Sequence, residues 1–293
     1  MKRVVFLSGK GGTGKTTLAA AFAKRLERIV VVDADVDAAN LHLVFRPEVD
    51  DTGIYSGSSV VVREDGACTA CGVCHDTCRF GAIDAALRID PLLCEGCGAC
   101  VSACPAAALR LVERPSGTWY AGRAEGRPMV GAELYAGEEV SGKLVAVIRE
   151  RADDLAEKTR MHRIAIDGSP GIGCPVIAST TGTQLAVLVT EPSRSGLHDL
   201  ERVLGVVRHF DVPATLILNK ADLSEPMAKE IEAFARRETL PLLGRIPYDE
   251  RVLHALRLGR SPTEDPESRA GRAIEAVIDR LVEVLSEAEG SDA

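Results

Sequence analysis

Aromatic side chains are scarce in this chain of 293 residues, where they make up 4% of the sequence and tryptophan occurs once. Since 46% of the residues are nevertheless hydrophobic, small aliphatic side chains must fill most of any core. No apolar run approaches the roughly 20 residues that a membrane-spanning helix requires. The first ten residues are typical of a strand and not of a signal peptide. We therefore expect a cytoplasmic protein that has no membrane partner.

A surplus of positive charge is also missing, because the formal net charge is −8. Such a charge argues against general binding to nucleic acid, whose phosphates attract basic surfaces. Cysteine, in contrast, occurs nine times. In a chain without an export signal, so many thiols indicate metal binding or catalysis rather than disulfides. The length suggests one or two domains.

The clearest motif is a glycine-rich segment between an apolar strand at residues 4–7 and an apolar helix from about residue 18. Its spacing, Gly-x4-Gly-Lys-Thr beginning at Gly9, fits the phosphate-binding loop of nucleotide hydrolases. Backbone N–H groups in such a turn, and the positive end of the helix dipole, favour a phosphate. Lys15 is expected to reach the β- and γ-phosphates, and the Thr16 hydroxyl to ligate Mg²⁺. The predicted nucleotide contacts are Gly11, Gly12, Thr13, Gly14, Lys15, Thr16 and Thr17.

Lys10 directly follows the first glycine of this loop. The arrangement resembles the deviant loop of the MinD/ParA superfamily of P-loop ATPases, in the SIMIBI class. In that superfamily the additional lysine reaches across a dimer to the partner's nucleotide. The resemblance therefore implies an ATPase that forms a homodimer when it binds ATP, with Lys10 and Lys15 both acting in catalysis. It also implies a doubly wound, mostly parallel α/β sheet.

Carboxylates close two further apolar strands, at residues 29–32 and 163–166. The carboxyl ends of parallel strands face the ligand crevice of a doubly wound sheet. The end of the strand at residues 29–32 resembles the first switch region of the MinD/ParA superfamily. The resemblance implies that Asp33, or alternatively Asp35, positions the attacking water. Asp167 resembles the Walker B aspartate that holds Mg²⁺. The alternative for both ends is a plain, solvated turn.

Two later segments are candidates for the base pocket. Asn219 follows an apolar strand and resembles the base-contacting asparagine of the superfamily, and Pro247 belongs to a loop that lines the base pocket in relatives. Asn219, Lys220 and Asp222 also match the Asn-Lys-x-Asp motif of guanine-specific GTPases. The choice between ATP and GTP therefore rests on Lys10, which favours ATP.

Eight of the nine cysteines form an internal repeat, because four of them in one run recur 26 residues later in a second run. The spacing, Cys-x2-Cys-x2-Cys-x3-Cys, resembles that of bacterial two-cluster ferredoxins, in which the fourth cysteine of each run ligates the other cluster. One 4Fe–4S cluster is accordingly assigned to Cys68, Cys71, Cys74 and Cys104, and a second to Cys94, Cys97, Cys100 and Cys78. Zinc is the main alternative, although zinc sites usually come as separated Cys-x2-Cys pairs.

Further features carry expectations of their own. Arg79 stands where the ferredoxin pattern usually has proline, and a cation there favours the reduced state of the adjoining cluster. Cys174 is expected to be a buried apolar residue.

Residues 47–59 are interpreted as a loop, residues 118–134 as a hairpin that returns the chain to the sheet, and residues 273–287 as an amphipathic helix that packs against the sheet.

These patterns together predict two domains and a joint function. Residues 1–59 and 113–293 are expected to form the ATPase domain, and residues 60–112 an inserted small α+β ferredoxin-like domain. The predicted function is an ATP-driven dimer switch that gates electron transfer through the two clusters to an unidentified redox partner. One alternative is an ATP-dependent carrier or maturation factor that delivers metal or iron–sulfur clusters to a client protein. The other is a positioning ATPase in which the clusters are structural or sensory.

Overall fold

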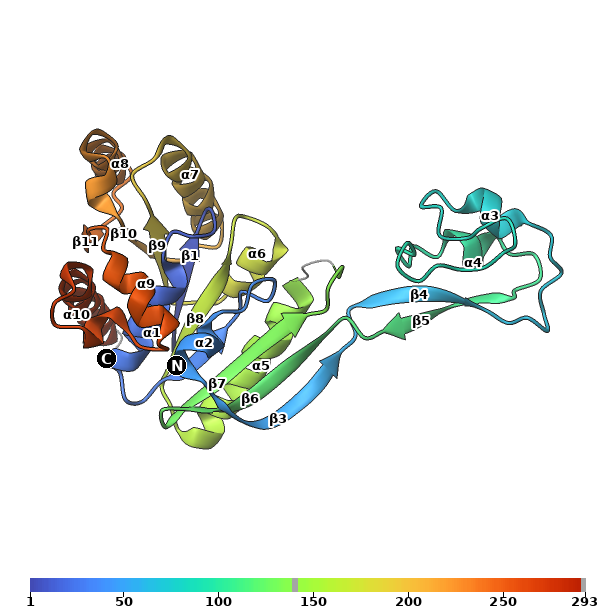
Figure 1. Cartoon of the computed structure of the whole chain (residues 1–293), viewed down its shortest axis with the longest axis horizontal. Coiled ribbons are helices and arrows are strands. Elements are labelled where there is room, and N and C mark those ends of the chain that lie inside the picture. The colour runs from blue at the N-terminus through green and yellow to red at the C-terminus, as the bar shows by residue number, and fades with distance from the viewer. Residues whose placement is uncertain (139–141, 291–293) are drawn as a thin grey trace. The chain divides into compact units, whose positions relative to one another are not determined.

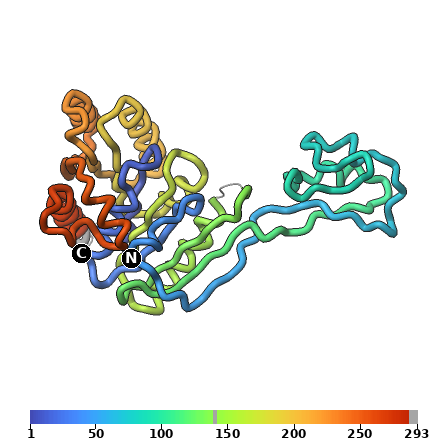
Figure 2. Tube along the Cα trace, viewed as in Figure 1, coloured from blue at the N-terminus to red at the C-terminus, as the bar shows by residue number. Residues whose placement is uncertain are grey.

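The computed structural model describes residues 1–138 and 142–290, and it consists of two compact units (Figure 1). The first unit contains Met1–Thr52, Trp119–Glu133 and the C-terminal part of the chain. The second contains Gly53–Thr118 and the short segment that begins at Leu134. Along the chain the second unit therefore interrupts the first, as the colours of the tube in Figure 2 also show.

The first unit is built around a sheet of nine strands, counted over the residues that the structure describes. In spatial order the strands are β11 (Leu242–Arg245), β10 (Ala214–Leu218), β9 (Leu185–Thr190), β1 (Lys2–Ser8), β8 (Arg163–Pro170), β2 (Val30–Asp33), β7 (Arg127–Leu134), β6 (Gly117–Ala124) and β3 (Glu48–Tyr55). The strands from β11 to β7 run parallel to one another. The prediction of a mostly parallel α/β sheet is therefore confirmed.

Helices cover both faces of this sheet. They are α1 (Lys15–Arg25), α2 (Leu41–Phe45), α5 (Gly142–Thr159), α6 (Cys174–Thr180), α7 (Arg194–His209), α8 (Glu225–Arg237), α9 (Glu250–Arg257) and α10 (Arg269–Gly290), with short 3₁₀ turns η1 (Ala221–Leu223) and η2 (Pro262–Glu264). Val4 and Phe6 of β1 pack in one apolar cluster with α1, α2 and α10. Val5 and Leu7, which point to the opposite face, are equally buried. Burial on both faces explains why the parallel strands are continuous apolar runs.

The prediction of a loop over residues 47–59 is wrong, because β3 lies there and is followed by β4 (Ser58–Arg63). The segment Asp50–Gly53 has low strand propensity, which hid β3 from the sequence pattern. The strand forms at the edge of the sheet, where the neighbouring backbone is unusually close. A Cβ atom on Gly122 of β6 would lie 2.1 Å from the carbonyl oxygen of Glu48, so this close approach requires glycine.

Two other predicted elements are confirmed. The hairpin expected over residues 118–134 is formed by β6 and β7, which turn at Glu125 and Gly126 with positive φ angles of 50° and 77°. The amphipathic C-terminal helix is α10, and its apolar side packs against α1 and the sheet. Ile274, Ile278 and Leu281 on that side are at most 2% exposed.

The second unit is a small α+β structure that repeats itself. Strands β4 and β5 (Leu109–Arg114) form an antiparallel pair. Two short helices, α3 (Val73–Thr77) and α4 (Ala99–Ala103), are each preceded by a glycine with positive φ. The helices begin 26 residues apart, so the internal repeat of the sequence is also a repeat of structure.

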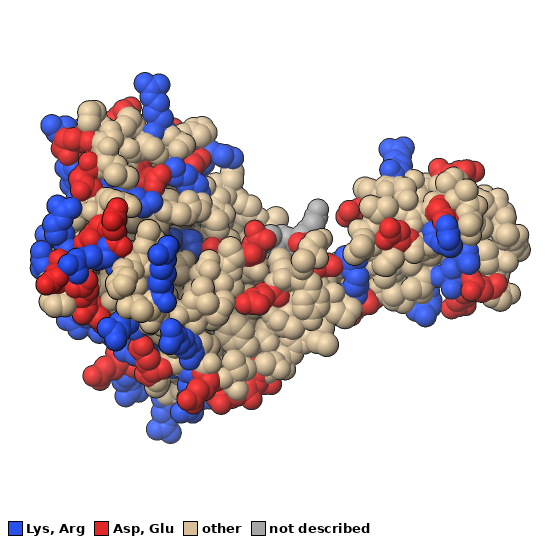
Figure 3. Space-filling model, in the orientation of Figure 1, with Lys and Arg blue, Asp and Glu red and all other residues tan. Residues whose placement is uncertain are grey.

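The surface carries mixed charge. On the face drawn in Figure 3, basic and acidic side chains are interspersed over both units. Among the described residues, no helix has the length and hydropathy needed to cross a bilayer.

Candidate functional site

The glycine-rich loop lies between β1 and α1, and β1 is flanked in the sheet by β8 and β9. Gly14 precedes α1 with a φ of 94°, and a Cβ atom there would lie 2.3 Å from the Nδ2 atom of Asn219. The positive φ favours glycine at this position, and a larger residue would also displace the Asn219 side chain. Lys15, the first residue of α1, is only 5% exposed. The loop therefore presents backbone N–H groups and a helix N-terminus at the carboxyl edge of the sheet, as an anion site requires.

The register of the parallel strands brings the predicted carboxylates to this lysine. Asp33 of β2 pairs with Asp167 of β8, the strand next to β1. The Lys15 ammonium lies 2.7 Å from Asp167 Oδ1 and 3.3 Å from Asp35 Oδ2. Asp33 is fully buried, and its Oδ2 accepts a hydrogen bond from the Leu41 amide at 3.0 Å. A lysine and three carboxylates thus occupy one buried cluster.

The electrostatics of this cluster favour a bound cation. Burial, together with the charge of Asp167, raises the pKa of Asp33 well above its usual value. Burial likewise raises the pKa of Asp35. Burial by itself lowers the pKa of Lys15, but the carboxylates of Asp167 and Asp35 outweigh this and raise it. Carboxylates that resist ionisation because they are crowded and desolvated are stabilised by an added positive charge.

Several buried oxygen atoms of the site have no hydrogen-bond partner in the described part of the chain. They are Thr13 Oγ1, Asp33 Oδ1, Asp35 Oδ1 and Asp167 Oδ2. Such orphaned acceptors are costly unless a ligand satisfies them. Carboxylate and hydroxyl oxygens are the donor set that Mg²⁺ prefers, so these residues fit a hydrated magnesium ion.

A cavity of about 680 Å³ opens in front of the loop. The predicted contacts that line it are Gly11, Gly12, Thr13, Gly14, Lys15, Thr16, Thr17, Asp35, Asn219 and Pro247. Apolar side chains of α2 and α9, including Leu43, Val252 and Leu256, form another wall. Asp33 and Asp167 are not among its lining residues and contact Lys15 or the backbone instead. The structure therefore gathers most predicted nucleotide residues around one space, with two carboxylates beneath it.

Asn219 supports the loop, and Asp222 has its own backbone partner. The Asn219 amide donates to the Thr13 carbonyl at 2.7 Å. Asp222 Oδ1 accepts a hydrogen bond from the Tyr248 amide at 2.6 Å. A guanine-reading aspartate must face the base, whereas Asp222 is exposed and does not line the cavity, which weighs against the GTPase interpretation of the motif.

Lys10 does not line the cavity but is held against the end of β9. Its ammonium lies 2.6 Å from Glu191 Oε1 and 3.1 Å from Ser195 Oγ. Glu191 also binds Lys220 at 3.0 Å. Burial by itself raises the pKa of Glu191, but these two lysines outweigh it and lower the pKa. The sequence carried no local signal for Glu191, because its partners are remote along the chain.

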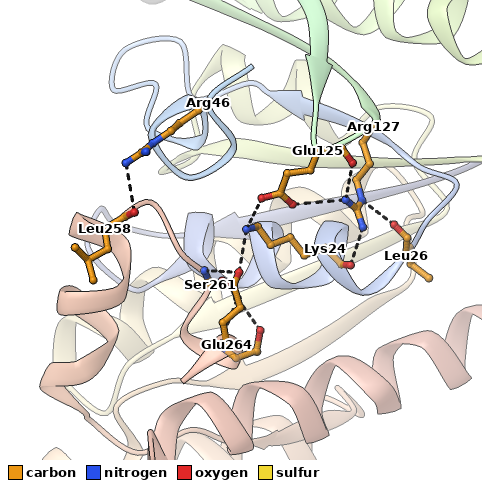
Figure 4. Close-up of polar contacts among 9 residues, drawn as sticks. Lys24, Leu26, Arg46, Glu125, Arg127, Leu258, Ser261 and Glu264 are labelled. Carbon is orange, nitrogen blue, oxygen red and sulfur yellow. Dashed lines mark hydrogen bonds and ion pairs between the residues drawn. The ribbon is translucent and has the colours of Figure 1, made fainter. Parts of the chain in front are cut away.

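The opposite end of α1 is anchored by a polar network (Figure 4). Lys24 binds Glu125 in the β6–β7 turn at 2.8 Å and Glu264 in η2 at 3.0 Å. The Arg127 guanidinium donates to the carbonyl oxygens of Lys24 and Leu26, both at 2.9 Å. These contacts fix the helix whose first turn carries the loop.

The eight repeated cysteines line two separate recesses in the second unit. Site 1 is lined by Cys68, Cys71, Cys74 and Cys104, and site 2 by Cys78, Cys94, Cys97 and Cys100. Each site combines three cysteines of one run with the fourth of the other. The Ala108 amide donates to Cys104 Sγ at 3.3 Å, and the Val61 amide to Cys94 Sγ at 3.5 Å. Within the described ranges, no three His, Cys, Asp or Glu side chains are arranged to hold a single metal ion.

The structure also places three residues outside the two ligand sets. Arg79 is exposed and lines neither recess. Arg63, at the end of β4, lines site 1 although no motif singled it out. In the first unit, the prediction that Cys174 is buried is wrong, because it is exposed at the first residue of α6. It directly follows Gly173, which is also exposed, whereas the next residue, Pro175, is buried.

The fold and the loop at the N-terminus of α1 define a P-loop nucleotide-binding protein. Residues 4–262 match the family described as the CobQ/CobB/MinD/ParA nucleotide binding domain, and the chain belongs to this family. The resemblance to MinD and ParA proteins is therefore confirmed at the level of the family.

Individual relatives extend this finding. An uncharacterized protein of Methanocaldococcus jannaschii is 36% identical over 229 residues, which are 76% of this chain and 79% of the relative. The iron–sulfur cluster carrier protein of Pyrococcus furiosus is 23% identical, over 98% of this chain and 88% of its own. The structure of the septum site-determining protein MinD from Pyrococcus horikoshii, complexed with Mg-ADP, gives a TM-score of 0.60 at 20% identity, covering 97% of both chains. At that identity the likeness to MinD shows the fold alone.

Proposed function

We propose that this P-loop ATPase uses ATP binding to close a homodimer, and that closure gates electron transfer through two 4Fe–4S clusters to a partner protein. The observation that carries the proposal is the division of the cysteines. Three cysteines of each run share a recess with the fourth cysteine of the other run. Two-cluster ferredoxins divide their ligands in this way. The nucleotide site in the same chain supplies the switch.

At the nucleotide site, Lys15 changes partners when the nucleotide binds. Its ammonium exchanges the carboxylates of Asp167 and Asp35 for the β- and γ-phosphates. Thr16 and Asp167 would hold Mg²⁺, and the ion would supply positive charge beside the phosphates. Asp33, or alternatively Asp35, orients the attacking water. Asn219 keeps the loop in place through its bond to the Thr13 carbonyl, and Pro247 lines the cavity where the base binds.

Dimer closure requires Lys10 to leave its present contacts. In the single chain, Glu191 and Ser195 hold its ammonium. The γ-phosphate of a nucleotide on a second copy offers a stronger, more highly charged acceptor. Lys10 therefore stays with Glu191 until a loaded partner approaches, which links dimerisation to ATP.

In the second unit, residues 60–112 act as a ferredoxin-like domain. Cys68, Cys71, Cys74 and Cys104 hold one cluster, and Cys94, Cys97, Cys100 and Cys78 hold the other. When bound, each cluster supplies one-electron transfer at a potential set by its surroundings. The N–H groups of Ala108 and Val61 donate to ligand sulfurs and stabilise their negative charge.

A second candidate function is delivery of iron–sulfur clusters to a client protein. It is favoured by similarity to proteins named iron–sulfur cluster carrier protein in Pyrococcus furiosus and Pyrococcus abyssi, at 23% and 24% identity. The two candidates differ in what leaves the protein. A redox protein gives up electrons and keeps its iron, whereas a carrier gives up iron and sulfide.

The test begins with anaerobically purified protein, in which iron, sulfide and zinc are measured. We expect two 4Fe–4S clusters per chain. The Cys71→Ser variant should lose the site 1 cluster and the Cys97→Ser variant the site 2 cluster, while Cys174→Ser, the matched control, should keep both. Zinc in place of iron would contradict the proposal.

A transfer assay then separates the two candidates. The reduced protein is mixed with a generic apo-ferredoxin, with and without MgATP. Retention of iron through repeated reduction and oxidation supports the redox function. MgATP-dependent appearance of clusters on the apo-ferredoxin supports the carrier function instead.

A further inference from the structure

The two cysteine sites differ in the charged side chains that line them. Among the described residues, the charged side chain that lines site 1 is Arg63, and the one that lines site 2 is Glu95. The sites are alike in two respects. Each has four cysteines, and each has one backbone N–H group that donates to a ligand sulfur. The charge difference is therefore the clearest asymmetry between the two sites.

Arg63 is held in place against site 1. Its Nε atom donates to Asp65 Oδ1 at 2.7 Å, and its Nη1 atom donates to the Leu87 carbonyl at 2.5 Å. Leu87 also lines site 1. The Arg63 side chain is 26% exposed, whereas that of Asp65 is 82% exposed. Solvent therefore screens the carboxylate more than it screens the guanidinium.

The Arg63 side chain lines the same recess as the thiols of Cys68 and Cys74. Arginine stays charged at every relevant pH. A fixed positive charge at this position stabilises additional negative charge on the ligands of site 1.

Site 2 differs in burial as well as in charge. Cys100 is 7% exposed, so additional negative charge there is poorly solvated. Arg79, which directly follows Cys78, is exposed and lines neither recess, so solvent screens its charge. Glu95 adds a carboxylate at the rim, where it is exposed and partly screened. Reducing an iron–sulfur cluster adds one negative charge to its site, so these surroundings oppose reduction.

We propose that Arg63 makes the two four-cysteine sites unequal, so that a cluster held at site 1 has a higher reduction potential than one held at site 2. This inference rests on the proposed function, because it presupposes that both sites hold clusters. In a titration with dithionite, the first electron delivered to each protein resides at site 1 and the second at site 2. When both sites are reduced, the electron at site 2 is the stronger reductant. The partner that needs the more reducing electron should therefore draw it from site 2.

The experiment is an EPR-monitored redox titration of the full-length protein, with no partner and no nucleotide. In the unaltered protein we expect two separate midpoint potentials. In Arg63→Gln the higher potential should fall and the lower one should stay. A tenfold loss in the equilibrium constant for reduction of site 1 corresponds to about 59 mV for a one-electron couple. Glu95→Gln should raise the lower potential, by less, because Glu95 is exposed.

Three further variants separate charge from structure. Arg63→Lys keeps the charge and should retain most of the separation between the potentials. Asp65→Asn removes the partner carboxylate and should raise the higher potential. Arg110→Gln is the matched control, because Arg110 pairs with Glu64, is 61% exposed and lines neither site. It should change neither potential.

The outcomes distinguish failure of the cluster proposal from failure of the inference about Arg63. Failure of the protein to bind iron would overturn the cluster proposal, and this inference with it. Iron bound at both sites, with an Arg63→Gln titration that matches the unaltered one or shifts only the lower potential, would overturn this inference and leave the proposed function standing.

Discussion

The two units differ in how much buried core surrounds their functional groups. In the first, Lys15, Asp33 and Asp167 are at most 5% exposed and stand on a sheet whose two faces are covered by helices. In the second, the buried apolar cluster consists of Val61, Ile83, Leu109 and Cys100, and the last is itself a predicted ligand. The nucleotide site is therefore organised by the core, whereas the cysteine sites have little core around them. The proposed clusters would supply the staple that so small a core lacks.

The largest effect should follow from removing the iron. Under the proposed function, anaerobic chelation should unfold the second unit and leave the first folded, because only the second would rely on metal for its core. Hydrogen exchange should show protection of β4 and β5 falling by about two orders of magnitude or more, while β1, β8 and β9 keep theirs. Equal loss of protection in both units would contradict the claim that metal stabilises the second unit alone.

A fully buried lysine with buried partners should matter more than a half-buried lysine with exposed partners on the same helix. Replacing Lys15 by Met leaves three buried carboxylates without their cation, which should cost about 3–5 kcal/mol of unfolding free energy in the absence of Mg²⁺. The matched variant, Lys24→Met, removes pairs with carboxylates that are 44% and 46% exposed, and it should cost about 1 kcal/mol or less. Urea denaturation measures both. Similar values for the two variants would contradict the burial argument.

Within the Asn-Lys-x-Asp motif, substitution of Asn219 should have a larger effect on nucleotide affinity than substitution of Asp222. Asn219→Ala removes a donor to the Thr13 carbonyl, so nucleotide affinity should fall by about 1–3 kcal/mol. Asp222→Ala removes only a contact with the Tyr248 amide, so ATP affinity should change by less than about threefold, or 0.7 kcal/mol. Calorimetric titration with ATP and with GTP measures both. A large, GTP-specific loss in Asp222→Ala would favour the guanine interpretation.

The smallest effect on stability should come from Glu191. Its pairs with Lys10 and Lys220 are partly exposed, so Glu191→Gln should change unfolding free energy by at most about 1 kcal/mol. Because it also releases Lys10, the variant should dimerise more readily with ATP, which analytical ultracentrifugation measures. A dimer weaker than that of the unaltered protein would mean that Glu191 does not restrain Lys10.

Much of the fold and of the nucleotide site was predictable because the signals are local. The glycine-rich loop joins a strand to a helix within a dozen residues, and Asp33 and Asp167 each end an apolar strand. Parallel pairing then forces these ends together at one edge of the sheet. The assignment of cysteines to two sites rested instead on the resemblance of two short runs to the two-cluster ferredoxin pattern.

What the sequence did not predict depends on contacts between distant residues. Strand β3 has weak propensity and exists because β6 lies beside it. Glu191 meets Lys10 across 181 positions of the chain, and Arg63 reaches Leu87 across 24. Exposure of Cys174 depends on how α6 lies in the folded unit. No periodicity or motif encodes such contacts, so they emerge only from the structure.

The central claim is that the nucleotide state governs the clusters. The most direct test is an EPR-monitored redox titration of the anaerobic protein with and without MgATP, alongside the Lys15→Ala variant. The account predicts two reducible 4Fe–4S clusters whose potentials or line shapes change when MgATP is added, and no such change in Lys15→Ala. Two clusters that behave identically with and without MgATP would contradict it, because the ATPase and the cysteine sites would then act independently.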